Sequence, residues 1–172
     1  MFRILCTVVA AALLFGCAGT GADLNFAAVS QRNGGLKNGQ GRIVLLRETQ
    51  FVGSMDGGHP VSLDGQPIGD LRTGTFLVRD VPAGRHELSV SRWSFPGVTK
   101  LDVNIASGRT YFYEANLSER SKALMVGSMA GLAGWAVTAA ATSGSENAGP
   151  VEFVLLDEAA GRQMVSELQL AQ

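Results

Sequence analysis

The stretch that decides the fold covers residues 60–71 and reads PVSLDGQPIGDL. Two short runs that suit β-strands flank the dipeptide Asp64-Gly65. This dipeptide is typical of two-residue hairpin turns, because Asp and Gly both tolerate the positive φ angles that such turns require. The sequence therefore predicts a hairpin whose strands include residues 60–63 and 68–71.

Similar short runs, separated by turn signals, continue on both sides of this hairpin. Residues 42–47 (RIVLLR) are a dense apolar run, which suits a strand buried on both faces. In residues 101–105, apolar and polar side chains alternate, as in a strand with one buried face. About seven such strands indicate a mainly β protein, an antiparallel β-sandwich or a barrel. The other predicted strands are residues 75–81, 86–91, 110–117 and 151–156.

The C-terminal end shows a different spacing. Met164, Val165 and Leu168 recur at helical intervals. We therefore expect a short C-terminal helix that covers a sheet edge.

Residues 1–16 have the features of a bacterial lipoprotein signal peptide. Arg3 precedes an apolar run, residues 4–15, that is too short to span a bilayer. The run ends in Leu14-Phe15-Gly16-Cys17, which resembles the lipobox that precedes a lipid-bearing cysteine. We expect cleavage before Cys17, lipid on Cys17 and anchoring in a membrane. An ordinary secretory signal with an incidental cysteine is the alternative.

The residues after Cys17 bear on location and domain organisation. Ala18 stands where an aspartate would favour retention in the inner membrane, so we expect the outer membrane, with the protein facing the periplasm. Residues 17–40 are rich in Gly, Asn, Ala and Gln, which predicts a flexible tether. Residues 41–172 are then the β-sandwich domain, with an apolar glycine-rich insertion and linker over 120–150.

Composition excludes several classes of function. The net charge of −1 gives no reason to expect nucleic acid as a partner. The two cysteines are Cys6, lost with the signal, and Cys17, used by lipid. No thiol would remain for a disulfide, a zinc cluster or a nucleophile, and we expect neither a metal nor a cofactor.

Candidate catalytic groups are few. The two histidines are His59, in a glycine-rich loop where a weak metal site is conceivable, and His86, aligned with the apolar positions of a strand. The sequence holds no Gly-x-Ser-x-Gly elbow, Walker A loop or dinucleotide fingerprint. Four aromatic residues on or near strands are expected to be core rather than a binding surface: Trp93, Phe95, Tyr111 and Tyr113.

The unusual feature is the uncharged, glycine-punctuated segment from Ala123 to Ala141. We expect one helix here, inserted before the last strand. It would be about 28 Å long, close to the thickness of a bilayer core. Gly127 and Gly131 form a GxxxG pair and Gly134 extends the small face, which would permit close helix packing. The segment could lie against the sandwich, insert into a membrane or join copies of the chain.

With these residues laid out, the chain resembles the bacterial family called domain of unknown function 2846. The resemblance implies a transthyretin-like or PEGA-like β-sandwich, found largely in predicted lipoproteins and without established catalytic residues. It covers residues 41–43 with Arg47, and residues 61–69, 74–76, 81–86 and 108–112.

Three hypotheses for function follow. The first is a lipid-anchored, non-catalytic envelope module that binds a protein or another envelope component. The second is an oligomerising or membrane-associating protein that acts through residues 123–141. The third is a small-ligand carrier or hydrolase on a transthyretin-like frame, for which His59 or His86 would line a polar pocket with carboxylates.

Overall fold

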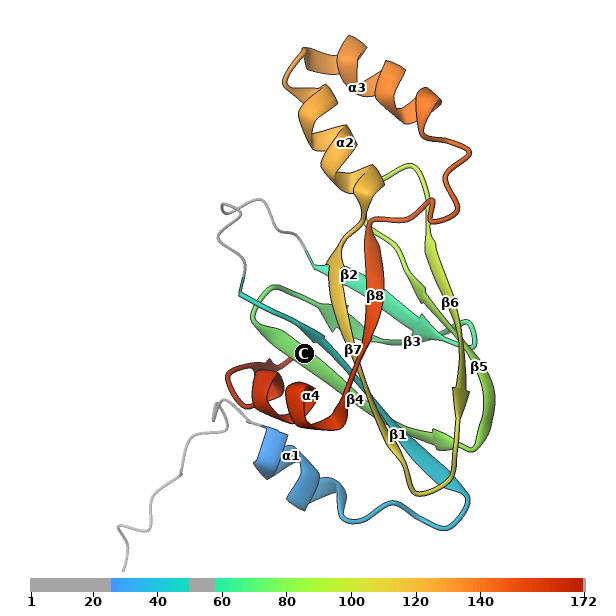
Figure 1. The fold of residues 1–172 in the computed structure, drawn as a ribbon, viewed down its shortest axis with the longest axis vertical. Helices are drawn as coiled ribbons and strands as arrows, with labels where there is room; N and C mark the ends of the chain where they lie inside the picture. The colour runs from blue at the N-terminus through green and yellow to red at the C-terminus, as the bar shows by residue number, and fades with distance from the viewer. Residues whose placement is uncertain (1–25, 50–57, 172) are drawn as a thin grey trace, which may run out of the picture.

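The computed structural model describes residues 26–49 and 58–171, which form two β-sheets and four helices (Figure 1). Cys17 and the signal peptide lie outside the described residues. One sheet has the strand order β8-β7-β1-β4-β9 and the other has the order β3-β2-β5-β6. The elements are α1 (Phe26–Asn33), β1 (Gln40–Arg47), β2 (His59–Leu63), β3 (Gln66–Leu71), β4 (Thr75–Pro82), β5 (Gly84–Val90), β6 (Thr99–Ile105), β7 (Thr110–Leu117), α2 (Glu119–Ser128), α3 (Gly131–Ala141), β8 (Val151–Leu156), α4 (Glu158–Val165) and β9 (Gln169–Leu170).

The predicted hairpin is confirmed. β2 and β3 pair antiparallel, with Leu63 opposite Gln66 across the turn. Asp64 and Gly65 have φ values of 50° and 76°, so both central residues adopt the left-handed conformation that this turn requires.

β1 lies at the centre of the five-stranded sheet and is buried along almost its whole length. Ile43 and Leu45 contribute to an apolar core between the two sheets. Val44 and Leu46 point to the opposite face and join a second core there. The prediction of a strand buried on both faces is therefore confirmed, and the mainly β, sandwich-like architecture with it.

The five-stranded sheet is mixed rather than antiparallel throughout. β1 pairs antiparallel with β4 but parallel with β7, and the short β9 pairs parallel with β4. Between β4 and β7 the chain crosses to the other sheet for β5 and β6 and then returns. A connection of that length can bring β7 beside β1 in the same direction, which a tight hairpin cannot do.

The outer face of the five-stranded sheet is covered by α1 and α4 (Figure 1). Phe26 of α1 makes edge-to-face contacts with Phe76 and Phe112, at centroid distances of 6.0 and 5.8 Å. Gly161 of α4 lies directly on Phe112, where an added Cβ would come within 2.3 Å of the ring. The second core thus lies between the outer face of this sheet and the helices α1 and α4.

Two sequence-based predictions differ from the structure. A flexible tether running to residue 40 is wrong for residues 26–33, because Val29 of α1 is buried in the second core. The C-terminal helix covers a sheet face rather than an edge, since Val165 and Leu168 belong to the same core. The chain continues beyond that helix into β9, which is too short to give a sequence signal.

Candidate functional site

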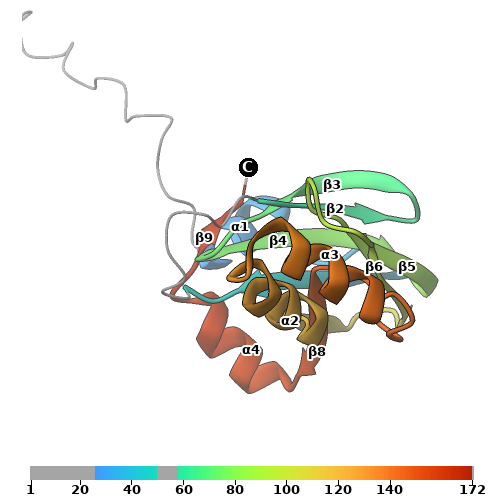
Figure 2. The same cartoon turned by 90° about the horizontal axis from the view of Figure 1, so that it is seen from above.

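The most distinctive part of the molecule is a helical hairpin, α2–α3, which projects from one end of the sandwich (Figure 1) and lies in front of the sheets in the view from above (Figure 2). The prediction of one long helix over residues 123–141 is wrong. α2 ends at Ser128, and the chain reverses before α3 begins at Gly131. Gly131 has a φ of 76°, a conformation that glycine adopts without steric cost and that interrupts a helix.

The two helices of the hairpin pack closely through small residues. A Cβ added at Gly127 would lie 2.3 Å from Oγ1 of Thr138, and one added at Gly134 would lie 2.4 Å from the carbonyl oxygen of Gly127. Gly131 lies in the turn, with nothing within 4 Å of an added Cβ. The predicted GxxxG pair therefore does not form one helix face: Gly127 faces Gly134 across the hairpin instead.

Arg120 fixes the base of the hairpin. Its guanidinium donates to the carbonyl oxygens of Ala148 (2.6 Å) and Ala139 (3.4 Å) and to Oγ1 of Thr142 (3.1 Å). It also lies 5.8 Å above the ring of Phe95, in the loop between β5 and β6. The side chain is buried, and its positive charge meets the carbonyl group of Ala139 near the C-terminal end of α3, where the helix dipole is negative.

Beyond this base the hairpin presents apolar side chains to the surroundings. Met129 and Leu132, at the turn, are 87% and 88% exposed. Val126 and Val137 are also exposed, and α3 has no buried residue. No charged residue occurs between Lys122 and Glu146. Exposed apolar surface of this kind marks a site of interaction.

His59 does not lie in a loop. It is the first residue of β2 and is fully buried, with its Nδ1 2.6 Å from a guanidinium nitrogen of Arg47. Because Arg47 donates, Nδ1 accepts and the imidazole is neutral. Burial, together with the positive charges of Arg47 and Arg92, lowers the pKa of His59 to about 3. Its neighbours in the predicted glycine-rich loop, residues 56 and 57, lie outside the described part.

His86 braces the β2–β3 turn. Its Nδ1 lies 2.6 Å from a carboxylate oxygen of Asp64, and its Nε2 lies 2.8 Å from the carbonyl oxygen of Pro82. The hydrogen bond to Asp64 raises the pKa of His86 and lowers that of Asp64. The second oxygen of Asp64 accepts from the backbone N–H of Glu87, so the turn is tied to β5.

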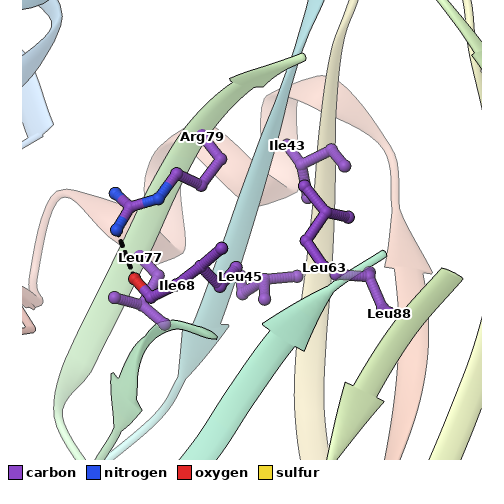
Figure 3. Close-up of a pocket in the computed structure, with 7 residues that line it drawn as sticks. All are labelled: Ile43, Leu45, Leu63, Ile68, Leu77, Arg79 and Leu88. Carbon is purple, nitrogen blue, oxygen red and sulfur yellow. Dashed lines mark hydrogen bonds between the residues drawn. The ribbon is translucent and has the colours of Figure 1, made fainter. Parts of the chain in front are cut away.

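Two cavities of the described part of the chain are lined by neither histidine. The first, shown in Figure 3, lies in the core between the sheets and leaves no space for a water molecule. Its single polar wall is the guanidinium of Arg79, which donates to the carbonyl oxygen of Ile68 (Figure 3). The other residues lining it are Ile43, Leu45, Leu63, Ile68, Leu77 and Leu88.

The second cavity is an open groove of about 440 Å³ beside α1 and includes Phe26, Thr110 and two arginines. Arg42 forms a two-point ion pair with Asp80, at 2.6 and 2.8 Å. This pairing raises the pKa of Arg42. Arg162 is held by Glu158 at 2.7 Å. Both cations are therefore already engaged within the protein.

Of the four aromatic residues expected in the core, two lie in it or against it and two do not. Tyr113 is buried and Tyr111 packs against the core between the sheets. Trp93 is 90% exposed, which contradicts its predicted place in the core, and Phe95 contacts Arg120 at the hairpin base. Trp93 lies in the loop after β5, which ends at Val90, and there strand alternation no longer indicates the direction of a side chain.

Two kinds of feature are absent from residues 26–49 and 58–171. No group of three or more His, Cys, Asp or Glu side chains in these ranges is placed to hold a metal ion. None of the helices described there combines the length and the apolar character needed to cross a membrane.

Comparison with known proteins identifies a family. A family model described as "Protein of unknown function (DUF2846)" matches residues 37–129, more than half of the chain. The match begins just before β1 and ends at Met129, in the turn between α2 and α3. No curated protein and no solved structure matches.

Proposed function

This chain belongs to the DUF2846 family, and we propose that it is a lipid-anchored, non-catalytic module of the bacterial cell envelope that works by binding. The lipid is attached to Cys17, and the domain faces the periplasm from the outer membrane. The α2–α3 hairpin is the element that makes the contact.

The observation that carries this proposal is the exposure of apolar side chains on a projecting element. Met129 and Leu132 stand almost fully exposed at the turn, although the sandwich buries residues of the same kind completely. Exposing them in water is unfavourable by about 25 cal/mol for each Å² of apolar surface. A binding partner that covered the hairpin would recover this free energy.

The roles of the two histidines support a non-catalytic module. His59 is held neutral by Arg47 in the interior, and His86 is bonded on both ring nitrogens at a structural turn. A general acid or base needs a nitrogen within reach of a substrate. Both imidazoles are instead engaged in holding strands together.

Mass spectrometry of the protein purified from bacterial membranes tests the anchor. We expect a mature chain that begins at Cys17 and carries diacylglycerol and an amide-linked acyl chain. A Cys17→Ala variant should lack these masses. A mature chain that begins at another residue, or that carries no lipid, would show the anchor to be wrong.

A matched pair of variants tests the contact element. Leu132→Glu places a charge on the exposed hairpin, whereas Leu155→Glu places the same charge on β8, where Leu155 is 56% exposed. We expect only the first to weaken retention of the protein in the envelope fraction when both are made in a variant that carries Cys17→Ala behind an ordinary secretory signal and so has no lipid. Equal behaviour of the two variants would exclude the hairpin as the contact.

A further inference from the structure

We propose that the partner of the α2–α3 hairpin is a lipid bilayer, into one leaflet of which the tip of the hairpin inserts. This inference rests on the proposed function of the hairpin as the contact element and identifies what it contacts. It also gives the protein a second membrane contact besides the lipid.

α3 is apolar around its whole circumference, which favours a bilayer as the partner. Its sequence, GLAGWAVTAAA, contains no charge and a single hydroxyl, and every residue of it is at least partly exposed. A groove on a protein partner covers one stripe of a helix and leaves the opposite face in water, where polar residues are expected. A bilayer surrounds an inserted element on all free sides, which matches the composition of α3.

The hydroxyl groups of the hairpin between Ala123 and Ser145 all have hydrogen-bond partners within that segment, which suits a lipid environment. In lipid, a polar group without a partner costs several kcal/mol, at roughly the level of an unsatisfied buried group. Each hydroxyl between Ala123 and Ser145 donates to a backbone carbonyl oxygen of its own segment. The pairs are Ser128 to Met125 (2.6 Å), Thr138 to Gly134 (2.9 Å), Thr142 to Thr138 (2.8 Å), Ser143 to Ala140 (2.8 Å) and Ser145 to Thr142 (2.8 Å).

Residue types change along the hairpin from apolar at the tip to charged near the base, as expected for an element that enters a membrane tip first. Met129 and Leu132 stand at the tip, whereas Lys122, with half of its side chain exposed, stands near the base. Exposed Trp93 lies in the loop between β5 and β6. Phe95 of the same loop contacts Arg120 at that base. Tryptophan and lysine favour the level of the lipid headgroups, and methionine and leucine favour the acyl chains.

The lengths of the helices agree with insertion into a single leaflet. α2 has 10 residues and α3 has 11. At about 1.5 Å per residue they are roughly 15–17 Å long. This is about half of a hydrocarbon core of roughly 30 Å. The tip could therefore enter the acyl region while Lys122 remains at the surface.

A second copy of the chain is the competing occupant, and the packing of the hairpin disfavours it. Close helix association between copies would use a smooth face of small residues. Gly127 and Gly134 already face each other inside the hairpin, at distances that exclude a side chain between them. The small-residue face is thus occupied within one molecule.

Quenching of tryptophan fluorescence tests the proposal directly. The chain contains two tryptophans, and Trp93→Phe leaves Trp135 of α3 as the single fluorophore. The full-length protein, purified in detergent, is reconstituted into phosphatidylethanolamine and phosphatidylglycerol vesicles whose acyl chains carry bromine. We expect a blue shift and loss of most of the Trp135 emission. Leu155→Glu should retain this quenching, and Leu132→Glu should lose it while still floating with the vesicles through the lipid.

The remaining outcomes test the insertion of the hairpin and the lipid anchor separately. Protein that floats with vesicles while Trp135 stays unquenched overturns the insertion, and crosslinking between copies in that state would identify a second copy as the occupant. If Leu132→Glu no longer floats although the parent does, the hairpin inserts and the lipid anchor of the proposed function is wrong. If no variant floats, both proposals are overturned.

Discussion

The sandwich and the α2–α3 hairpin use the same apolar residue types in opposite ways. Leu46 of β1 is fully buried between the sheet and its covering helices, whereas Leu132 of α3 is 88% exposed. Both faces of the five-stranded sheet have a second layer to pack on, but the outer surface of the hairpin has none within the described chain. The comparison separates residues that hold the fold together from residues that are free to contact something else.

Substitutions in the two regions should differ most in their effect on stability. Phe112→Ala removes a fully buried ring that contacts Phe26 and Gly161, so we expect the free energy of unfolding to fall by about 3–5 kcal/mol. Leu132→Ala, on the exposed tip, should change it by less than about 0.5 kcal/mol. Urea denaturation of both variants measures the difference, and similar losses would mean that the hairpin is part of the stabilising core.

The buried histidine should make the sandwich sensitive to acid. The pKa of His59 is about 3 in the folded protein, against an ordinary value of 6.5, so below pH 6.5 the unfolded chain binds a proton that the folded protein does not. Stability should then decline as the pH falls from 6.5 towards 3, with this group contributing a loss of roughly 2 kcal/mol between pH 7 and pH 5.

NMR isolates this contribution, because the chain has only two histidines. The imidazole resonances of His59 should not titrate between pH 7 and pH 5, whereas those of His86 should titrate above pH 6.5. A His86→Gln variant assigns the two sets of signals. Titration of His59 near its ordinary value would contradict the buried contact with Arg47.

A change inside the hairpin should leave the sandwich unaffected. Gly127→Ala adds a Cβ that would lie 2.3 Å from Oγ1 of Thr138 and should destabilise the α2–α3 contact by about 1–3 kcal/mol. Gly144→Ala, where nothing lies within 4 Å, is the matched control. Hydrogen exchange should become faster in α2 and α3 of the first variant alone. Faster exchange in β1 as well would show that the two regions unfold together.

The smallest effect is expected at the β2–β3 turn. Asp64→Asn keeps a residue that tolerates positive φ but removes the charge paired with His86. The pair stabilises the fold mainly between pH 3.8, the ordinary pKa of Asp64, and pH 6.5, the ordinary pKa of His86. Its contribution declines as the pH falls below 3.8 and as the pH rises through the raised pKa of His86. Because Asp64 is half exposed, the loss should stay below about 1 kcal/mol, while the pKa of His86 returns towards 6.5 in an NMR titration.

The sequence predicted the elements that local patterns control. The turn at Asp64 and Gly65, the doubly buried β1 and the alternating β6 follow from turn chemistry and from periodicity. The parallel pairing of β1 with β7 depends on a long connection through the other sheet, which no short-range pattern records. The docking of α1 likewise depends on Phe76 and Phe112, which are distant from it in the sequence.

The candidate site shows the same limit. The uncharged composition of residues 123–141 singled out the segment, but periodicity alone could not place a helix break at Gly131. A glycine can lie within a helix, pack against another helix or reverse the chain. For Gly127 the role follows from its close contact with Thr138 of α3, which is not visible in the local sequence. Trp93 escaped prediction because loop side chains follow no strand alternation.

The docking of α1 has a mechanical consequence for a chain anchored at Cys17. Only residues 18–25 separate that cysteine from Phe26. A chain of this length reaches at most roughly 30 Å when fully extended, at about 3.3–3.6 Å per residue. α1 lies at the end of the molecule away from α2–α3 (Figure 1). If the proposed lipid at Cys17 and the proposed insertion of the hairpin hold opposite ends of the molecule, its rotation would be restricted. The four-stranded sheet would then keep a constant orientation relative to the membrane plane.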